Sequence, residues 1–152
     1  MSEAGIVAPA KVLLTFHAIA ARLRHLLDTN DLRHVDDVVA VARGGVVAGA
    51  LVAYHLGLPL HVVRSRFRDD GNAPMATAPT VAAQSPDLTG HHVLVVDDVS
   101  VTGATLRAVA EVLGAAGTTT LVLKGRPGSA DHVVFDDVPS CVAWPWEVEA
   151  TG

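Results

Sequence analysis

Unbroken apolar runs recur along the chain and alternate with stretches whose apolar residues follow helical spacing. The runs are rich in Val, Leu and Ala and cover residues 38–42, 60–63, 92–96 and 119–123, with a fifth, shorter run at 133–135. Such runs are typical of strands that are buried on both faces, as in a parallel sheet covered by helices.

The stretches between the runs predict helices, because their apolar residues recur on one helical face. The predicted helices cover residues 12–27, 46–56 and 104–116. Pro9 suits the start of the first helix, Gly57 suits the C-cap of the second, and Gly117 follows the third. Strands and helices therefore alternate, which favours an α/β fold with a mainly parallel, twisted sheet flanked by helices. With no internal repeat or boundary, residues 1–152 are expected to form one domain.

Composition narrows the class of protein. Half of the 152 residues are hydrophobic, and the formal net charge is −5, which argues against a general nucleic-acid partner. Cys141 is the only cysteine, so no internal disulfide can form and a reducing compartment is expected. The N-terminus lacks the basic start of a signal peptide, and no apolar run approaches the ~20 residues of a membrane span. We expect a cytoplasmic protein without a membrane partner.

Residues 93–106 carry the most informative pattern. An apolar strand delivers Asp97 and Asp98 to its carboxyl end, where ligands of open α/β sheets bind. Gly103 allows the backbone to approach a ligand, and the free N–H groups of the next helix can hold a phosphate together with the hydroxyls of Thr102 and Thr105. A charged loop that merely caps a helix is the alternative.

The two carboxylates predict the rest of the ligand. Neighbouring side chains on a strand point to opposite faces, so Asp97 and Asp98 are expected to do different jobs. One can accept hydrogen bonds from a sugar diol, and the other can hold Mg²⁺ directly or through water. The pattern therefore indicates a sugar phosphate that carries a second, metal-bound phosphate group.

This segment resembles the motif with which type I phosphoribosyltransferases bind phosphoribosyl diphosphate (PRPP). The resemblance implies that family's fold with a small C-terminal hood, a catalytic acidic pair Asp97–Asp98 at the ribose and Mg²⁺, and a 5-phosphate loop. The loop residues would be Val101, Thr102, Gly103, Ala104 and Thr105.

A second segment, 42–45, resembles the family's pyrophosphate loop. The resemblance implies that Arg43 is catalytic and binds pyrophosphate with Gly44 and Gly45. It also implies a non-proline cis peptide, which we predict between Arg43 and Gly44. Taken alone, the two glycines would indicate only a tight turn.

The long, aperiodic segment 64–90 lies where the family has a flexible loop that closes over the site. Arg64 and Arg66 are then candidates to meet the diphosphate, with solvated surface arginines as the alternative. Loops of this length in a compact domain are usually functional or disordered.

The hood of the family grips the base, and here it would comprise about residues 124–147 with the N-terminal segment. Lys124, Val142 and Trp144 are the predicted base-binding residues, and Lys124 would favour a 6-oxopurine. Trp144 is equally a candidate for the core. Cys141 replaces the family's stacking aromatic ring, and Val101 replaces the aspartate that oxopurine enzymes often carry.

The resemblance implies a glycosyltransferase, more narrowly a pentosyltransferase of purine salvage. It would transfer the 5-phosphoribosyl group from PRPP to a base, most in keeping with a 6-oxopurine, with Mg²⁺ as cofactor and a homodimer as the assembly. Two alternatives stay open: a phosphoribosyltransferase for a non-purine base, and a PRPP-sensing regulator on the same fold.

Overall fold

The computed structural model describes residues 11–66, 80–81, 86–138 and 141–147. Six strands form the central sheet in the order β4-β3-β2-β5-β6-β7, and every neighbouring pair is parallel except β3–β4. The strands are β2 (Asp37–Ala42), β3 (Leu60–Arg66), β4 (Thr80–Val81), β5 (His92–Ser100), β6 (Gly117–Gly125) and β7 (His132–Val133). The predicted α/β fold with a mainly parallel sheet is confirmed.

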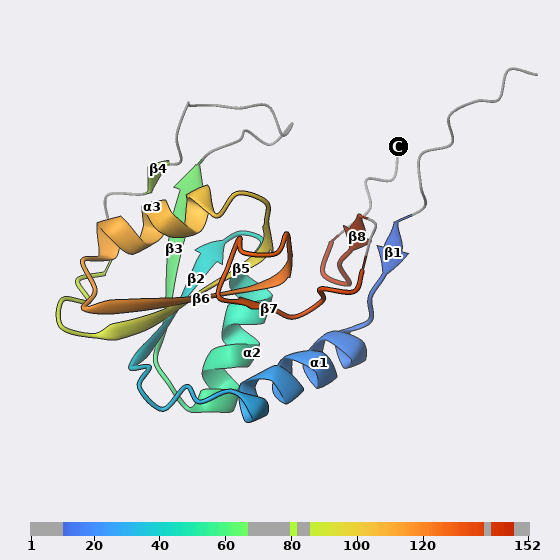
Figure 1. Ribbon diagram of the computed structural model, residues 1–152, viewed down its shortest axis with the longest axis horizontal. Helices are drawn as coiled ribbons and strands as arrows, with labels where there is room; N and C mark the ends of the chain where they lie inside the picture. The colour runs from blue at the N-terminus through green and yellow to red at the C-terminus, as the bar shows by residue number, and fades with distance from the viewer. Residues whose placement is uncertain (1–10, 67–79, 82–85, 139–140, 148–152) are drawn as a thin grey trace, which may run out of the picture.

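Three helices cover the two faces of the sheet (Figure 1). α1 (Phe16–Thr29) and α2 (Val46–Leu56) pack on one face, and α3 (Ala104–Leu113) packs on the other. β5 shows why an unbroken apolar run is needed, because its residues alternate between the two cores. Leu94 and Val96 join the cluster under α1 and α2, whereas Val93 and Val95 join the cluster under α3.

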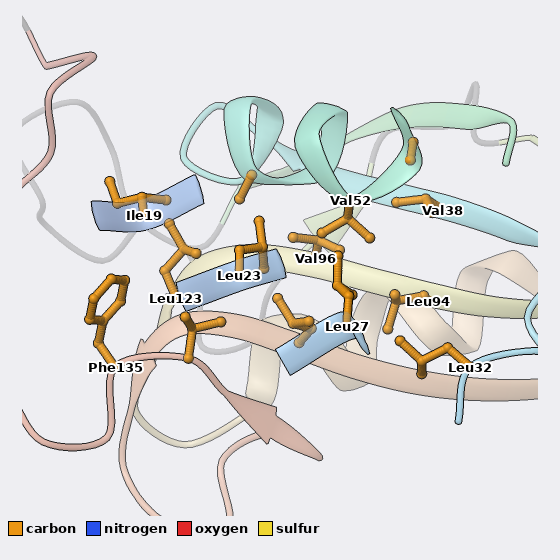
Figure 2. Packing of buried hydrophobic residues seen from close by; sticks show 14 of the residues in the cluster. Ile19, Leu23, Leu27, Leu32, Val38, Val52, Leu94, Val96, Leu123 and Phe135 are labelled. Atoms are coloured by element: carbon orange, nitrogen blue, oxygen red, sulfur yellow. The ribbon is translucent and has the colours of Figure 1, made fainter. Parts of the chain in front are cut away.

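The larger core lies between α1, α2 and the sheet (Figure 2). Ile19 and Leu23 of α1 and Val52 of α2 meet Val96 of β5 there, and all four side chains are buried. Burial of such a side chain contributes roughly 1.5–3 kcal/mol. This packing holds β5 against α1 and α2.

Three helix ends differ from the sequence prediction, and one of them is the end of α1, which lies at Thr29 instead of residue 27. α3 ends at Leu113, three residues before the predicted end, with Gly114 in the left-handed conformation (φ 60°), and Gly117 begins β6. α1 begins only at Phe16, where Thr15 caps it by accepting the N–H of Ala18 at 3.0 Å. Gly57 caps α2 as predicted, with a φ of 68°.

The residues before α1 form a strand instead of a helical turn. β1 (Val12–Leu13) pairs in parallel with β8 (Val142–Ala143), and this two-stranded unit is called the terminal sheet below. Apolar spacing alone could not separate the strand from the helix, because the partner strand lies about 130 residues away in the sequence. Pro9, the predicted helix start, lies outside the described residues.

Other boundaries are longer or shorter than predicted. β5 continues past Val96 to Ser100, and β7 is shorter than the run at 133–135. Part of the predicted loop 64–90 is strand, because β3 extends to Arg66 and pairs with β4; residues 67–79 and 82–85 lie outside the described residues. In the part of the chain that the structure describes, no helix is both long and apolar enough to cross a membrane.

Candidate active site

A cavity of about 650 Å³ opens at the carboxyl ends of β2, β3 and β5, where α3 begins. Val41 and Ala42 of β2, Ser65 of β3 and residues 97–106 line it. We call it the phosphate cavity, because it contains the turn predicted to hold the 5-phosphate. The acidic pair and the predicted phosphate loop therefore meet in one hollow at the end of the sheet where ligands of this fold class bind.

The two aspartates have different surroundings. Asp97 and Asp98 are consecutive residues of β5, so their side chains leave opposite faces of the strand. Asp97 Oδ1 accepts the N–H of Asp98 at 2.8 Å, and Asp98 Oδ1 accepts the N–H of Val99 at 2.7 Å. Burial raises the pKa of Asp97 well above its ordinary value, and the neighbouring charge of Asp98 raises it further.

The turn 101–105 joins β5 to α3. Gly103 adopts a φ of 79° immediately before Ala104, the first residue of the helix, and such a φ favours glycine. Thr102 is held on both sides: its hydroxyl accepts the N–H of Ala104 at 3.2 Å, and its carbonyl accepts Nη1 of Arg107 at 2.9 Å. Because the first N–H groups of a helix lack intrahelical partners, this turn offers donors to an anion.

The glycines after β2 pack directly on the acidic pair. A Cβ on Gly44 would lie 2.5 Å from Oδ1 of Asp98, and a Cβ on Gly45 would lie 2.8 Å from Cα of Asp97. Only a residue without a side chain permits this approach. The predicted pyrophosphate loop and the predicted ribose-binding carboxylates are therefore in contact.

The non-proline cis peptide of this loop joins Ala42 to Arg43. The sequence prediction placed it one bond later, between Arg43 and Gly44, and that prediction is wrong. Ala42 is the last residue of β2 and still pairs with Arg64 of β3, so the chain can leave the sheet only at the next bond. The motif identifies the loop, but the strand register decides where the loop begins.

A second cavity of about 1190 Å³ lies between this loop and the terminal sheet. Arg43, Gly44 and Asp98 line one side, and Leu13 and residues 143–147 line the other. We call it the hood cavity. Asp98 lines both cavities, so its carboxylate marks the place where they meet.

Two tryptophans of the hood cavity have different environments. Trp144 is buried in the core cluster, and its ring stacks on Trp146 with centroids 5.3 Å apart and planes 3° apart. Trp146 is half-buried and also meets the ring of Phe16 at 6.0 Å. Trp144 thus takes the core position that the sequence left open, although it also lines the cavity.

The family model of the phosphoribosyl transferase domain matches residues 11–152. The chain belongs to this family. It is therefore a phosphoribosyltransferase, a glycosyltransferase that uses PRPP, as the two motifs predicted.

Solved structures agree with this assignment. The purine phosphoribosyltransferase of Pyrococcus horikoshii is 29% identical and superimposes with a TM-score of 0.75 over 91% of this chain and 95% of that chain. The xanthine-guanine-hypoxanthine phosphoribosyltransferase of Helicobacter pylori shares the fold at 19% identity, with a TM-score of 0.69 over 91% and 95% of the two chains. The orotate phosphoribosyltransferase of Aeropyrum pernix is 33% identical, with a TM-score of 0.51 over 76% and 62%. The names of these structures refer to different bases.

Three of the remaining predicted residues of this phosphoribosyltransferase, Lys124, Arg64 and Val142, are not among the described residues that line the two cavities. Lys124 is half-buried on β6 and pairs in register with Val99, which lines the phosphate cavity. Arg64 is exposed on β3, and Arg66 ends that strand, with its side chain outside the described part. Val142 is buried in β8, so it supports the hood cavity from behind.

Three residues that the sequence did not single out belong to the phosphoribosyltransferase site. Lys11 and Trp146 line the hood cavity, and Ser65 lines the phosphate cavity. The Ser65 hydroxyl is buried and has no hydrogen-bond partner within the described ranges. Its position between Arg64 and Arg66 gave no signal, because only the sheet register shows that β3 ends beside the acidic pair.

The carboxylates of this phosphoribosyltransferase suit one particular kind of metal ion. Within the described residues, no group of three or more His, Cys, Asp or Glu side chains could hold a metal by itself. Asp97 and Asp98 supply carboxylate oxygen, which Mg²⁺ prefers, and Mg²⁺ commonly completes its shell with water and substrate phosphates. The donor set therefore fits an ion that binds together with a diphosphate.

Proposed function

We propose that this phosphoribosyltransferase transfers the 5-phosphoribosyl group from PRPP to a 6-oxopurine, giving a nucleoside monophosphate and pyrophosphate. The observation that carries the proposal is the position of Asp98, which lines both cavities. A ribose at Asp98 would place its 5-phosphate toward the turn 101–105 and its C1 toward the hood cavity.

The proposed roles follow from this arrangement. The turn 101–105 binds the 5-phosphate through backbone N–H groups and hydroxyls, and the acidic pair orients the ribose. Arg43 and the N–H groups of Gly44 and Gly45 bind the pyrophosphate and stabilise the charge that it gains as it leaves. Asp97 and Asp98 would hold Mg²⁺, which neutralises the diphosphate when it is bound.

The reaction needs no covalent intermediate with the protein. The base nitrogen forms its bond to C1 of the ribose while the bond from C1 to the pyrophosphate oxygen breaks, and the electron pair of that bond leaves with pyrophosphate. Orientation of the two substrates is the main contribution of the site. The apolar walls of the hood cavity, Leu13 and Trp146 among them, would hold a planar base.

Two observations favour a second candidate, a phosphoribosyltransferase for another base. Residue 101 of the phosphate loop is an exposed valine, and a valine has no carboxylate that could handle a proton of the purine ring. Cys141 is exposed in the place of the family's stacking ring. Against this candidate stands the purine phosphoribosyltransferase of Pyrococcus horikoshii, which covers the chain almost completely.

The experiment that separates these candidates measures pyrophosphate release from PRPP and Mg²⁺. Guanine, xanthine, hypoxanthine, adenine, uracil and orotate are offered in separate reactions. Rapid release with an oxopurine supports the proposal, and release with a different base supports the second candidate. Absence of release with every base, while PRPP still raises the melting temperature, would contradict both and favour a regulator that senses PRPP.

A further inference from the structure

The segment after β6 closes the phosphate loop from behind. Ser100, the last residue of β5, and Ser129, in the turn after β6, exchange two hydrogen bonds. The hydroxyl of Ser100 donates to the carbonyl of Ser129 at 3.3 Å, and the hydroxyl of Ser129 donates to the carbonyl of Ser100 at 3.2 Å. Both residues are buried, so water does not compete for these groups.

Ser129 also lies against Gly103, in the middle of the loop. A Cβ on Gly103 would lie 2.8 Å from the carbonyl oxygen of Ser129, and a Cβ on Gly125 would lie 2.6 Å from its hydroxyl. The close approach therefore depends on glycine at both positions. Val101 and Thr102, which lie between the two contact points, are exposed and line the phosphate cavity.

Ser129 itself lies outside the phosphate cavity. It lines a separate hollow of about 570 Å³ on the other side of Gly103, together with Arg107 and Asp131. A substrate in the phosphate cavity would therefore meet the loop, and the loop would rest on Ser129.

We infer that Ser129 is a positioning residue for PRPP, because its contacts with Ser100, just before the loop, and with Gly103, within the loop, hold the loop in the conformation that binds the 5-phosphate. The inference rests on the proposed role of the turn 101–105 as the phosphate site. N–H groups that are already aligned bind an anion without first having to be ordered, so loss of the support should weaken PRPP and leave the base unaffected.

The hydrogen bonds of the Ser100 carbonyl allow the positioning role of Ser129 to be distinguished from a purely structural role. The carbonyl of Ser100 also accepts the N–H of Arg126 at 3.2 Å. In Ser129→Ala the buried carbonyl of Ser100 therefore still accepts the N–H of Arg126. The loss of folding stability should be small for that reason. The residue immediately before the loop, Ser100, by contrast loses one of the two hydrogen bonds that join it to Ser129.

The test compares PRPP affinity, measured by titration calorimetry with Mg²⁺, in the wild type, Ser129→Ala and Ser100→Ala. Loss of one buried hydrogen bond corresponds to about a fivefold change in an equilibrium constant. We expect the dissociation constant of PRPP and its KM to rise about fivefold in each variant. The KM of the base and kcat at saturating PRPP should change less than twofold.

Thr119→Val is the matched control. The Thr119 hydroxyl bonds to Nε2 of His92 at 2.9 Å, so the variant removes a hydroxyl hydrogen bond between β5 and β6 at the opposite end of the same strands. PRPP affinity should stay at the wild-type value there.

Three outcomes would overturn the inference. Unchanged PRPP affinity in Ser129→Ala, with or without a lower melting temperature, shows that Ser129 is structural only. Equal losses for PRPP and base show a general distortion of the enzyme. Failure of the wild-type protein to bind PRPP would contradict the role of the turn 101–105 as the phosphate site, and with it the inference about Ser129. The titration contains no base, so this outcome is distinct from a wrong assignment of the base.

Discussion

At the scale of single residues, Asp98 is the described residue that lines both the phosphate cavity and the hood cavity. Its carboxylate lies beside Gly44. We predict that Asp98→Asn lowers kcat/KM by roughly 10²–10³-fold, the size seen when one charge-stabilising group is lost. The amide oxygen can still accept the N–H of Val99, so the melting temperature should change by no more than a few degrees. Unchanged steady-state kinetics would contradict the role of Asp98.

A substitution at Gly44 tests the same carboxylate, because Gly44 packs directly against the Asp98 side chain. Its added Cβ would press on the end of the Asp98 side chain, which can rotate away, and not on backbone. We therefore predict that Gly44→Ala still folds, as measured by its thermal transition. It should lose most of its activity, as measured by pyrophosphate release. A variant that keeps full activity would show that the close contact is not needed.

Gly57→Ala is the control for Gly44→Ala. Gly57 has a φ of 68° and open space around its Cβ position, so alanine there meets strain but no clash. The left-handed conformation costs roughly 1–2 kcal/mol for a residue with a Cβ. The control should lower the free energy of unfolding by about that amount and leave the kinetics unchanged.

At the scale of elements, the segment after β8 carries Trp146, which lines the hood cavity, and Trp144, on which Trp146 stacks and which packs into the core. We predict that Trp146→Ala raises the KM of the base about tenfold, because stacking of a base on an aromatic ring is worth about 1–3 kcal/mol. The KM of PRPP should not change. Trp144→Ala should instead cost roughly 3–5 kcal/mol of stability, measured by urea unfolding, because Trp144 is buried. Equal effects of Trp146→Ala on both substrates would contradict a base-binding role.

An acid–base cluster lies at the opposite end of the sheet from the site. Asp37 at the amino end of β2 is its centre, and it bonds to His61 near the amino end of β3 and to His91 just before β5. Burial alone would raise the pKa of Asp37, but hydrogen bonds from His61, at 3.0 Å, and from His91 outweigh it and hold that pKa below its usual value. The hydrogen bond to Asp37 raises the pKa of His91 against the effect of burial, and the charges of Asp36 and Asp87 add to the rise.

These shifts predict the pH dependence of stability. The contribution of Asp37 is present above about pH 4 and is lost as the pH falls through its lowered pKa. The contribution of His91 is present below about pH 6.5 and is lost as the pH rises through its raised pKa. The melting temperature should therefore be highest between about pH 4 and 6.5, as far as this cluster determines it, and should fall toward pH 8.

The variant His91→Gln tests this prediction, because it removes the titrating group while keeping a hydrogen-bond donor. Its melting temperature should vary less between pH 6 and 8 than that of the wild type. His25→Gln, an exposed histidine of α1, is the control and should keep the wild-type pH profile. An unchanged profile in His91→Gln would contradict the role of the cluster.

At the scale of the whole molecule, the resemblance predicts a homodimer and a cytoplasmic location, and both stay predictions. We expect light scattering at micromolar concentration to give twice the chain mass of 15.7 kDa. A monomer that is fully active would show that one chain carries a complete site. Such a result would leave the family assignment unchanged, because that rests on the match over residues 11–152.

The sequence by itself determined the family, the helices and the strands β2, β3, β5, β6 and β7, but it did not indicate β4 or the terminal sheet. Unbroken apolar runs can belong only to elements buried on both faces, and the segments 42–45 and 93–106 combine strand, glycine and carboxylate in an order that few folds share. These signals are local, so a single pass along the chain can find them. The same locality explains why the predicted helix 104–116 is too long: nothing nearby in the sequence shows that the helix ends before Gly114 instead of before Gly117.

Only the tertiary structure decided which distant residues meet. The register of β2 with β3 brought Ser65 to the acidic pair and set the cis peptide one bond earlier, and the pairing of β1 with β8 placed Lys11 in the hood cavity. The contact of Ser129 with Ser100 likewise joins segments that are 29 residues apart. Such contacts depend on strand pairing and chain reversal, whose geometry comes from packing of the whole sheet and leaves no pattern in the neighbouring residues.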